Sequence, residues 1–307
     1  MGIRHLNSIL QQSANNAIEK IPFINLRGKR IAIDTSIYLY RFKSEDELIE
    51  SFYLMISLFK HYNIFPIFVF DGKPPKEKKE VVEKRIKQKE VAKKDYVELK
   101  QKVESKQQKP TIEVKEKLDK LKKTCTTLNK RDIREVKALF DVYGVNYVIA
   151  EGEAEQYCAR LVQKRLAWAV LSEDMDLFVY GCPRVLRYIS LMNRTVVYYN
   201  MREILYELKL SQKEFKQICI LSGTDYNKTP YSLYDSFKLF AKFKKSEEND
   251  FWVWLKKRNY ELDYESMNVA ANLINLEHIK VFDQFKHKGY NIQELHTFME
   301  KHNFIYI

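Results

Sequence analysis

The sequence predicts an α/β fold with a mostly parallel, twisted central sheet flanked by helices. Four short apolar runs, at residues 31–33, 64–70, 145–150 and 168–171, have the length of buried strands. Segments with apolar residues at helical spacing separate these runs, as expected when parallel strands are joined by crossover helices. Each run is also followed by acidic residues, which predicts where the chemistry of such a sheet lies.

The composition indicates a folded intracellular protein. The chain has 307 residues and 45% of them are hydrophobic, so it can bury a full core. No apolar run approaches the roughly 18 residues of a membrane span, and the start of the chain lacks the apolar region of a signal peptide. The four cysteines form no C-x-x-C pair, which argues against zinc and against disulfides: Cys125, Cys158, Cys182 and Cys219.

The charge is strongly and unevenly positive. The formal net charge is +12 and the isoelectric point is near 9.2, which indicates a polyanionic partner. Residues 76–123 contain 18 Lys and Arg against 10 Asp and Glu, so two thirds of the net charge lies in this segment. We expect the partner to bind there.

The beginning of the chain predicts a helix, a strand and a second helix. Residues 2–20 have the spacing of a short amphipathic helix. The strand at 31–33 ends at Asp34, and Thr35 and Ser36 are suited to cap the helix that follows. A helix over 45–62 is expected next, before a strand that stops at Asp71.

Residues 76–123 predict two long, mostly exposed helices broken near 105–111. The segment is densely charged and contains no Gly and a single Pro. A solvated helical hairpin without a ligand is the simpler interpretation, but the segment starts directly beyond the Asp71 loop. Lys78 and Arg85 are seven residues apart, two helical turns, so they share a face that can look back at this loop.

The middle of the chain repeats the strand and carboxylate pattern twice. A helix over 131–143 precedes the third strand, after which Glu153 and Glu155 open a helix. Acidic residues at a helix start ordinarily complement its dipole, but their number here exceeds that need. The fourth strand leads into LSEDMDLF, which places Asp174 and Asp176 two residues apart.

The last third of the chain has weaker signals. Residues 185–191 and 194–199 alternate as an antiparallel hairpin at a sheet edge. Ser211 is suited to cap a helix, and Asp225 follows that helix in the sequence SGTDY. Residues 231–243 predict another helix rich in Lys, and the remainder carries no strong motif.

Seven carboxylates therefore occupy comparable places, and four of the sites follow predicted strands that end at one edge of a parallel sheet. Such a cluster needs cations to neutralise it. Oxygen ligands without His or Cys suit two Mg²⁺ ions, with Mn²⁺ as a substitute, and a basic segment beside them makes phosphodiester hydrolysis the simplest interpretation. The candidate ligands are Asp34, Asp71, Glu153, Glu155, Asp174, Asp176 and Asp225.

The sequence also resembles the flap endonuclease/XPG family of structure-specific 5′ nucleases. The matching motifs run in order from Met1 to about Tyr226: MGI, IDTSIYLY, VFDGKPP, EGEAEQYCARLV, SEDMDLF and ILSGTDY. The ending ELHTFMEKHNF is similar to the close of the flap endonuclease core. A single motif would be weak support, whereas six in order are specific.

The resemblance implies a SAF/PIN-like domain, two divalent ions and cleavage of DNA at 5′-flap junctions. Asp71 and Glu155 would lie nearer one ion, and Asp174, Asp176 and Asp225 nearer the other. Two further carboxylates would act largely through metal-bound water: Asp34 and Glu153.

The resemblance also assigns DNA contacts. Lys78 and Arg85 would contact the scissile phosphate, and the basic segment with Lys84 and Lys89 would form an arch for the 5′ strand. Tyr40 would stack on a base, although core packing is an equal alternative. Gly2 matches a position close to the junction, and the downstream duplex would meet Lys228, Lys238 and Lys242.

The resemblance divides the chain into regions of one nuclease domain. These are an N-terminal region 1–75, the arch 76–130, an internal region 131–226, a helix-two-turn-helix-like region 211–260 and a C-terminal helical region 261–307. The turn after Tyr226 lacks the usual glycines, which leaves K⁺ binding open there. No sliding-clamp peptide is recognisable, and a monomer, either cellular and nuclear or viral, is expected.

Three functions remain open from the sequence. A flap endonuclease with 5′→3′ exonuclease activity is favoured because the basic segment is long. A Holliday-junction resolvase or a dedicated exonuclease of the same superfamily is the second interpretation. An inactive DNA-binding scaffold is the third, but it has no reason to keep a costly acidic cluster. Glu173 is expected to point away from the ions, toward a basic or backbone partner.

Overall fold

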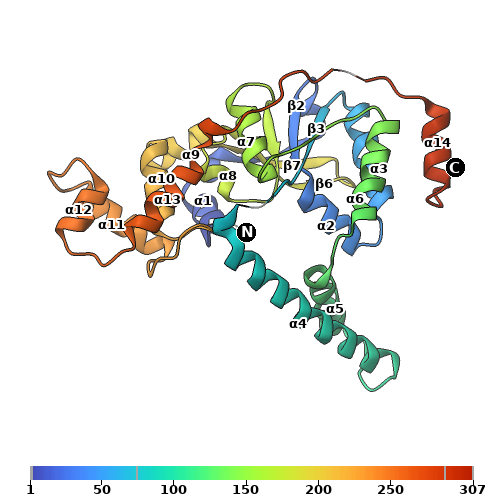
Figure 1. Ribbon diagram of the computed structural model, residues 1–307, viewed down its shortest axis with the longest axis horizontal. Coiled ribbons are helices and arrows are strands. Elements are labelled where there is room, and N and C mark those ends of the chain that lie inside the picture. Colours follow the sequence, from blue (N-terminus) through green and yellow to red (C-terminus); the bar gives the residue numbers. More distant parts are fainter. Residues whose placement is uncertain (1–2, 74, 287, 306–307) are drawn as a thin grey trace.

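The computed structural model describes residues 3–73, 75–286 and 288–305 and contains a seven-stranded mixed sheet. The strand order is β1-β7-β6-β5-β2-β3-β4 (Figure 1). The strands are β1 (Ile18–Pro22), β2 (Arg30–Asp34), β3 (Phe65–Phe70), β4 (Asn146–Ile149), β5 (Ala169–Leu171), β6 (Arg184–Ser190) and β7 (Thr195–Asn200).

Five neighbouring strands are parallel, as the sequence predicts. β2 pairs in parallel with β3 and β5, while β4 and β6 extend this arrangement on either side. Their side chains alternate between two buried layers: Ala32 packs on one face of the sheet, and Ile31 and Ile33 pack on the other. Strands buried on both faces need apolar residues at every position, which explains the continuous apolar runs.

The other edge differs from the prediction. β6 and β7 form the expected antiparallel hairpin, but β1 pairs with β7 and covers it, so the hairpin is not the edge. The predicted helix over residues 2–20 is also wrong in its second half. The helix α1 (Leu6–Ser13) ends early, and Ile18–Pro22 forms β1, because pairing with β7 satisfies its backbone.

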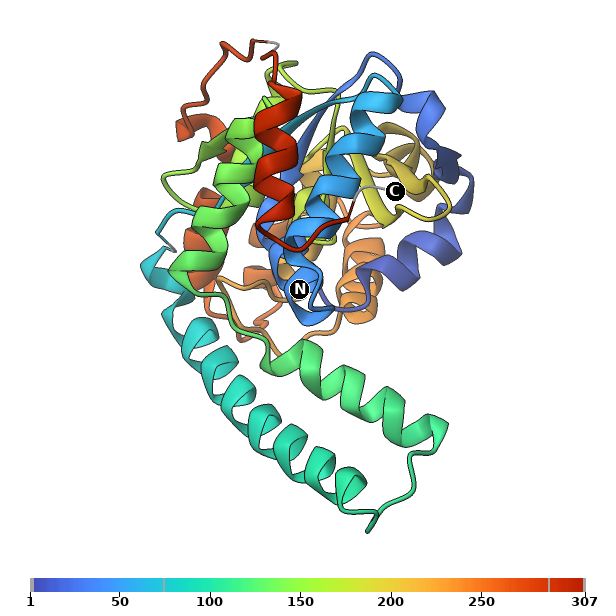
Figure 2. The same cartoon turned by 90° about the vertical axis from the view of Figure 1, so that its right-hand side faces the viewer.

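One face of the sheet is covered by α2 (Thr35–Ser44), α3 (Leu48–His61), α6 (Lys130–Val142) and α14 (Ile292–Glu300), all visible in Figure 2. Aromatic rings fill the space between these helices and β3. The ring of Phe52 lies edge-on to Phe68 and to Phe140, and the last two stack with centroids 4.2 Å apart. Edge-to-face and offset contacts of this kind stabilise a core beyond the area that they bury.

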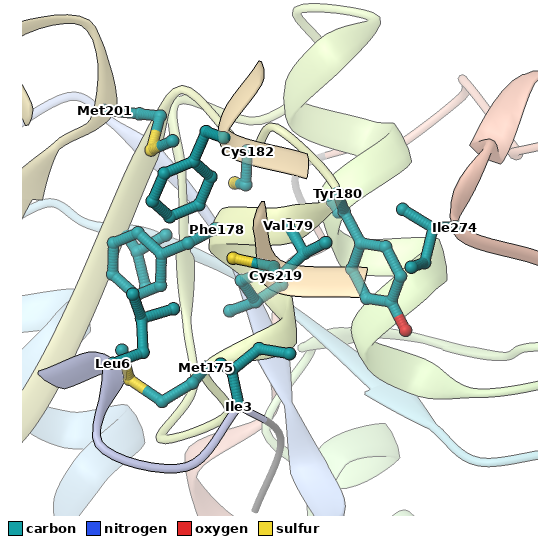
Figure 3. Packing of buried hydrophobic residues seen from close by; sticks show 14 of the residues in the cluster. Ile3, Leu6, Met175, Phe178, Val179, Tyr180, Cys182, Met201, Cys219 and Ile274 are labelled. Atoms are coloured by element: carbon teal, nitrogen blue, oxygen red, sulfur yellow. The ribbon is translucent and has the colours of Figure 1, made fainter. Parts of the chain in front are cut away.

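The opposite face is covered by α1, α7 (Ala154–Gln163), α8 (Asp176–Val179), α9 (Met201–Leu208) and α10 (Gln212–Leu221). Figure 3 shows Leu6, Met175, Phe178 and Cys219 converging in this layer. The burial of α8 here fixes the loop that carries the acidic pair of LSEDMDLF. Three cysteines are buried as free thiols, as the sequence predicts: Cys158, Cys182 and Cys219.

The basic segment forms the two predicted helices. A short 3₁₀ turn, η3 (Lys76–Lys78), leads into α4 (Lys79–Glu104), and α5 (Ile112–Cys125) returns alongside it. Figures 1 and 2 show this hairpin projecting from the body of the molecule. Its helices bury few apolar side chains, and Thr111 caps the start of α5 by accepting a hydrogen bond from Val114. We use the name arch for α4, α5 and the loop that joins them, residues 79–125, so that the turn η3 with Lys78 precedes the arch.

The remaining helices extend the end of the molecule that lies beyond α10. They are α11 (Leu233–Phe243), α12 (Phe251–Lys257) and α13 (Tyr264–Ile274). Three 3₁₀ turns lie elsewhere: η1 (Asn15–Ala17) and η2 (Phe23–Leu26) flank β1, and η4 (Leu276–His278) contacts α7. Ser211 caps α10 through a capping box, as predicted. Among the described residues, no helix is both long enough and apolar enough to cross a membrane.

Candidate functional site

The predicted carboxylates meet at the edge of the sheet where the parallel strands end. Asp34 is the last residue of β2, and its partner across the ladder is Val69, two residues before Asp71. β4 leads into the start of α7 with Glu153 and Glu155, and β5 leads into the loop with the acidic pair. The prediction that four separate segments bring their carboxylates to one edge is therefore confirmed. We call this the catalytic edge.

Lys78 is buried in the middle of the catalytic edge. Its Nζ lies 2.6 Å from Glu153 Oε1, 3.5 Å from Glu155 Oε1 and 3.7 Å from Asp225 Oδ2. Burial alone would lower the pKa of this amine, but the negative charges of Glu155 and Glu153 outweigh that effect and raise the pKa above its usual value. Lys78 is therefore a permanent cation at the centre of the acidic cluster.

Arg85 reaches the same cluster from the next turns of the arch. Its Nη2 donates to Asp225 Oδ2 across 3.0 Å, and its side chain stays 43% exposed. The prediction that Lys78 and Arg85 share a face is confirmed, since both contact Asp225. Their target differs from the predicted Asp71 loop, because their ion pairs within the described residues are with other carboxylates of the cluster. An arginine with its remaining N–H groups in solvent is suited to bind a phosphate.

Hydrogen bonds hold Asp34 and Asp71 in place. Ser172 Oγ donates to Asp34 Oδ2 across 3.0 Å, Ser36 Oγ donates to Asp71 Oδ2, and the Ala154 N–H donates to Asp71 Oδ1 across 2.8 Å. The prediction that Ser36 caps α2 is wrong. Its hydroxyl instead links the start of α2 to Asp71, the residue after β3. Thr35 provides no cap either: its hydroxyl donates to the Ile33 carbonyl.

The acidic pair is organised by the backbone of its own loop. The Asp174 N–H donates to Ser172 Oγ, and the Asp176 N–H donates to Asp174 Oδ1 across 2.9 Å. Asp176 Oδ1 is buried without a hydrogen-bond partner among the described residues. An unpartnered carboxylate oxygen in the interior is costly, and a cation would relieve that cost.

Burial and mutual repulsion disfavour the charged forms of three of these carboxyls. Burial, followed by the charge of Asp71, raises the pKa of Asp34 to about 8. Burial raises the pKa of Glu155 well above its usual range, and the neighbouring Glu153 adds to the effect. Burial and the charge of Asp174 do the same to Asp176. Without added cations, these three carboxyls are therefore held toward their neutral, protonated forms.

The side chains are not arranged around one empty coordination centre. Among the described residues, no three His, Cys, Asp or Glu side chains form a group that could hold a metal ion as they stand. The ammonium of Lys78 occupies the space between Glu153, Glu155 and Asp225. Three of the other carboxylates accept hydrogen bonds from serine hydroxyls or backbone N–H groups: Asp34, Asp71 and Asp174. The donor chemistry fits a hard divalent cation, and small side-chain rotations would be needed to assemble its ligands.

A tyrosine network behind Glu153 was missed by the sequence interpretation. Tyr226 OH donates to Glu153 Oε2 across 2.6 Å and accepts from Gln156 Nε2 across 2.9 Å. Tyr180 OH lies 3.2 Å from the same hydroxyl. The signal available was position, since Tyr226 directly follows Asp225 and Gln156 directly follows Glu155.

Glu173 points away from the cluster, as predicted. The Tyr188 N–H donates to Glu173 Oε1 across 2.6 Å, and Arg187 donates to the Glu173 backbone carbonyl. Arg187 Nε also lies 3.5 Å from Glu173 Oε2. This buried arginine ties the loop of the acidic pair to β6, so the loop is held from behind.

Tyr40 is exposed rather than part of the core. Its side chain lies below the arch, and the ammonium of Lys89 sits 4.2 Å from the centroid of its ring. The core-packing alternative is therefore wrong, because the ring is exposed and lies against Lys89 of the arch. Lys84 lines a cavity of about 800 Å³ that lies between α4 and α5 of the arch and is open to solvent.

The predicted duplex contacts lie beyond α10. Lys238 and Lys242 are exposed on α11, whereas Lys228 pairs with Glu80 of the arch across 2.6 Å. The turn that lacks glycines is closed by polar side chains: Thr224 Oγ1 bonds Asn227 Oδ1 across 2.7 Å. The turn keeps its shape because buried side-chain hydrogen bonds replace glycine flexibility. Gly2, the last of the predicted contacts, lies outside the described residues.

Comparisons with known proteins agree with this geometry. Residues 1–92 match the XPG N-terminal domain, and residues 144–225 match the XPG I-region. Flap endonuclease 1 of Encephalitozoon cuniculi is 32% identical over 247 residues, which are 75% of this chain and 68% of that protein. Flap endonuclease 1 of Candida tropicalis is 29% identical over 84% of this chain and 72% of its own length.

Solved structures share the fold. The catalytic core of Rad2 in complex with a DNA substrate superposes with a TM-score of 0.67 at 23% identity, covering 95% of this chain and 93% of that chain. Flap endonuclease-1 from Methanococcus jannaschii superposes with a TM-score of 0.60 over 92% of this chain and 94% of that chain, also at 23% identity. Family domains, relatives and fold together show that this chain belongs to the flap endonuclease/XPG family of structure-specific nucleases.

Proposed function

We propose that this chain is a 5′ nuclease that hydrolyses DNA phosphodiesters at 5′-flap junctions, with 5′→3′ exonuclease activity, in replication, repair or recombination. The observation that carries the proposal is the catalytic edge, where the predicted carboxylates gather and three of them contact the buried Lys78 at the base of the arch. Flap endonuclease 1 relatives support the activity. The nuclease regions and their boundaries, from 1–75 to 261–307, stay a prediction.

The catalytic edge is proposed to use two Mg²⁺ ions, which Mn²⁺ can replace. Asp71 and Glu155 would hold one ion, with Asp34 and Glu153 farther out. Asp174, Asp176 and Asp225 would hold the other, and the unpartnered Asp176 Oδ1 supports this assignment. When bound, such ions activate water and stabilise the leaving oxygen of an in-line displacement. The raised pKa values of three carboxyls fit a site that is built to be neutralised by cations.

The basic side chains are proposed to position the DNA. Lys78 and Arg85 already converge on Asp225, so a scissile phosphate that enters the cluster meets both cations. The exposed ring of Tyr40 is available to stack on the base beside the cut, and Lys89 above it would contact the adjacent backbone. The 5′ strand would pass the arch, and Lys238 and Lys242 would hold the duplex.

A panel of 5′-labelled flap, nicked, blunt and four-way DNA substrates tests the proposal. With Mg²⁺, we expect the flap to be cleaved fastest, and with a chelator we expect no cleavage. Cleavage that persists in the chelator would contradict the metal assignment. No cleavage of any substrate would overturn the nuclease function, and a preference for the four-way substrate would favour the resolvase, which the long arch and the relatives do not support.

A further inference from the structure

Apart from the basic arch, a basic groove lies at the end of the sheet opposite the catalytic edge. Two cavities of about 240 and 400 Å³ open there, and they share Phe65, Pro66 and Asn146 as lining residues. Phe65 starts β3, whereas Asp71 follows its end, so six residues of strand separate the groove from the catalytic edge. At the usual rise per residue this is about 20 Å.

The groove is formed by the segment between α13 and α14, which crosses this end of the sheet in Figure 1. The segment is fixed in three ways. Asn146 Nδ2 donates to the Lys286 carbonyl across 2.9 Å. Tyr290 packs edge-on against Tyr143 with centroids 4.9 Å apart. Gly144 has a φ of +63°, and a Cβ there would lie 2.4 Å from the Gly289 carbonyl oxygen, so only glycine permits this approach.

Four cations line the groove without an acidic counterpart. They come from three separate parts of the chain, and the described lining residues of both cavities include no Asp or Glu. Within the described residues none of the four forms an ion pair, whereas Lys43 and Lys244 elsewhere are each paired with a carboxylate. Two of the cations line each cavity, and four unpaired cations along two adjoining cavities favour an anionic ligand. The four are Arg30, Lys60, Lys286 and Lys288.

Lys60 is the most constrained of these cations. Its Nζ lies 5.0 Å from the ring centroid of Tyr143 and 4.6 Å from that of Tyr290. Burial lowers the pKa of this amine, and no neighbouring carboxylate offsets the effect. An ammonium held between two rings, partly removed from water and unpaired, gains from a phosphate that enters the cavity.

We propose that this groove binds a single strand of nucleic acid, with its phosphates on the four cations and a base against the exposed ring of Tyr290. Two adjoining cavities, each lined by two cations, suit a chain of phosphates better than one free anion. Cations interleaved with an aromatic ring are the combination that binds single strands without sequence preference. A strand bound here lies outside the catalytic edge, so the groove adds a remote anchoring site to the nuclease.

Photocrosslinking in chelator, where no cleavage is expected, tests the groove directly. The probe is an oligothymidylate of about 12 nucleotides that carries 5-iodouracil. We expect mass spectrometry to find a crosslink in the peptide that contains Tyr290. Crosslinks confined to the arch and the catalytic edge would overturn the proposal.

Matched neutralising variants add a quantitative test by fluorescence anisotropy. Lys286→Gln with Lys288→Gln removes two exposed groove cations, and Lys20→Gln with Lys301→Gln removes two exposed cations elsewhere. We expect the groove variant to lose roughly tenfold in affinity and to reduce the salt slope by about 1.4, as two lost contacts to a single strand predict. The control variant should change neither.

Three further results would overturn the proposal. The first is that the two variants have equal salt slopes. The second is that thymidine monophosphate or inorganic phosphate binds as tightly as the oligonucleotide, and the third is that polyglutamate abolishes the crosslink as effectively as unlabelled oligonucleotide. Cleavage of a short flap should be unchanged in the groove variant. If the protein cleaved no flap at all, the proposed function would fail, whereas the crosslink and the salt slopes would still decide the groove.

Discussion

The catalytic edge and the arch use the same kinds of charged residue in opposite ways. At the edge, Lys78 has a side chain only 6% exposed and contacts three carboxylates from two segments, the start of α7 and the turn after α10. In the arch, Lys102 pairs with Glu98 one turn away, and these side chains are 47% and 66% exposed. A buried cation whose partners are fixed cannot be removed without leaving charges unpaired, whereas an exposed pair exchanges readily with water. The comparison fits the proposed roles, with chemistry at the edge and guidance of the strand by the arch.

The largest expected effect comes from removing the buried cation. Lys78→Met should lower the single-turnover rate constant for flap cleavage by about 10²–10³-fold, because the charge that we propose to face the scissile phosphate is lost. Lys79→Met is the matched control, since this lysine is the exposed neighbour at the start of α4. Quench-flow measurements on both variants decide the point, and equal rates would show that the buried position of Lys78 has no special role.

The second effect is a pH dependence of stability in metal-free buffer. A carboxyl with a raised folded-state pKa, such as Asp34 with a pKa near 8, contributes stability that is fully present below its unfolded value near 3.8. That stability is lost as pH rises through about 8. Thermal unfolding should therefore show Tm falling by about 5 °C between pH 6 and pH 9.

Two controls sharpen the pH measurement. Asp34→Asn should flatten the dependence, because the titrating group is gone. Saturating Mg²⁺ should raise Tm more at pH 9 than at pH 6, because the ion neutralises the same charges. A Tm that rises between these pH values without metal would contradict the assignment of repulsion to the catalytic edge.

A smaller effect is expected from the tyrosine network. Tyr226→Phe removes the hydrogen bond to Glu153 and should lower the rate constant by about tenfold with little change in flap affinity, because Glu153 loses its orientation. Tyr206→Phe is the control, since its side chain is 84% exposed. An effect on affinity alone would mean that Tyr226 contacts DNA and does not position Glu153.

The smallest effect should come from the arch. Glu98→Gln breaks an exposed pair one turn apart, so Tm should move by less than about 1 °C and the cleavage rate should not change. Differential scanning calorimetry measures the first and the flap assay the second. A loss of several degrees would show that the arch depends on its ion pairs for structure, and the contrast with the catalytic edge would fail.

The sequence was sufficient for the architecture where local signals and tertiary contacts agree. The continuous apolar runs of β2 and β3 predict strands buried on both faces, and the carboxylates that end them predict the catalytic edge. The two helices of the arch could be predicted equally well, because a segment with such a high density of charge favours an exposed helical hairpin. In each case one short stretch of sequence contains the residues that determine the local structure.

The wrong predictions concern residues whose local structure is determined by contacts with residues distant in the sequence. Residues 18–22 form β1 only because β7 is available to pair with them. The hydroxyl of Ser36 has an adequate local role as a cap, but Asp71, 35 residues away, is the better partner. The polar turn around Asn227 was unexpected for a similar reason, since its side-chain bonds to α10 replace the missing glycines. Local preference yields to a buried polar partner in such cases.

The most direct test of the division between edge and arch measures flap affinity and single-turnover rate on two variants in parallel. Asp174→Ala should keep the dissociation constant within about threefold and lose at least about 10³-fold in rate. Lys84→Gln with Lys89→Gln should do the opposite, with about tenfold weaker binding and a rate at saturation within about threefold of the original. Retained cleavage by Asp174→Ala, or a rate loss explained wholly by weaker binding, would contradict the account.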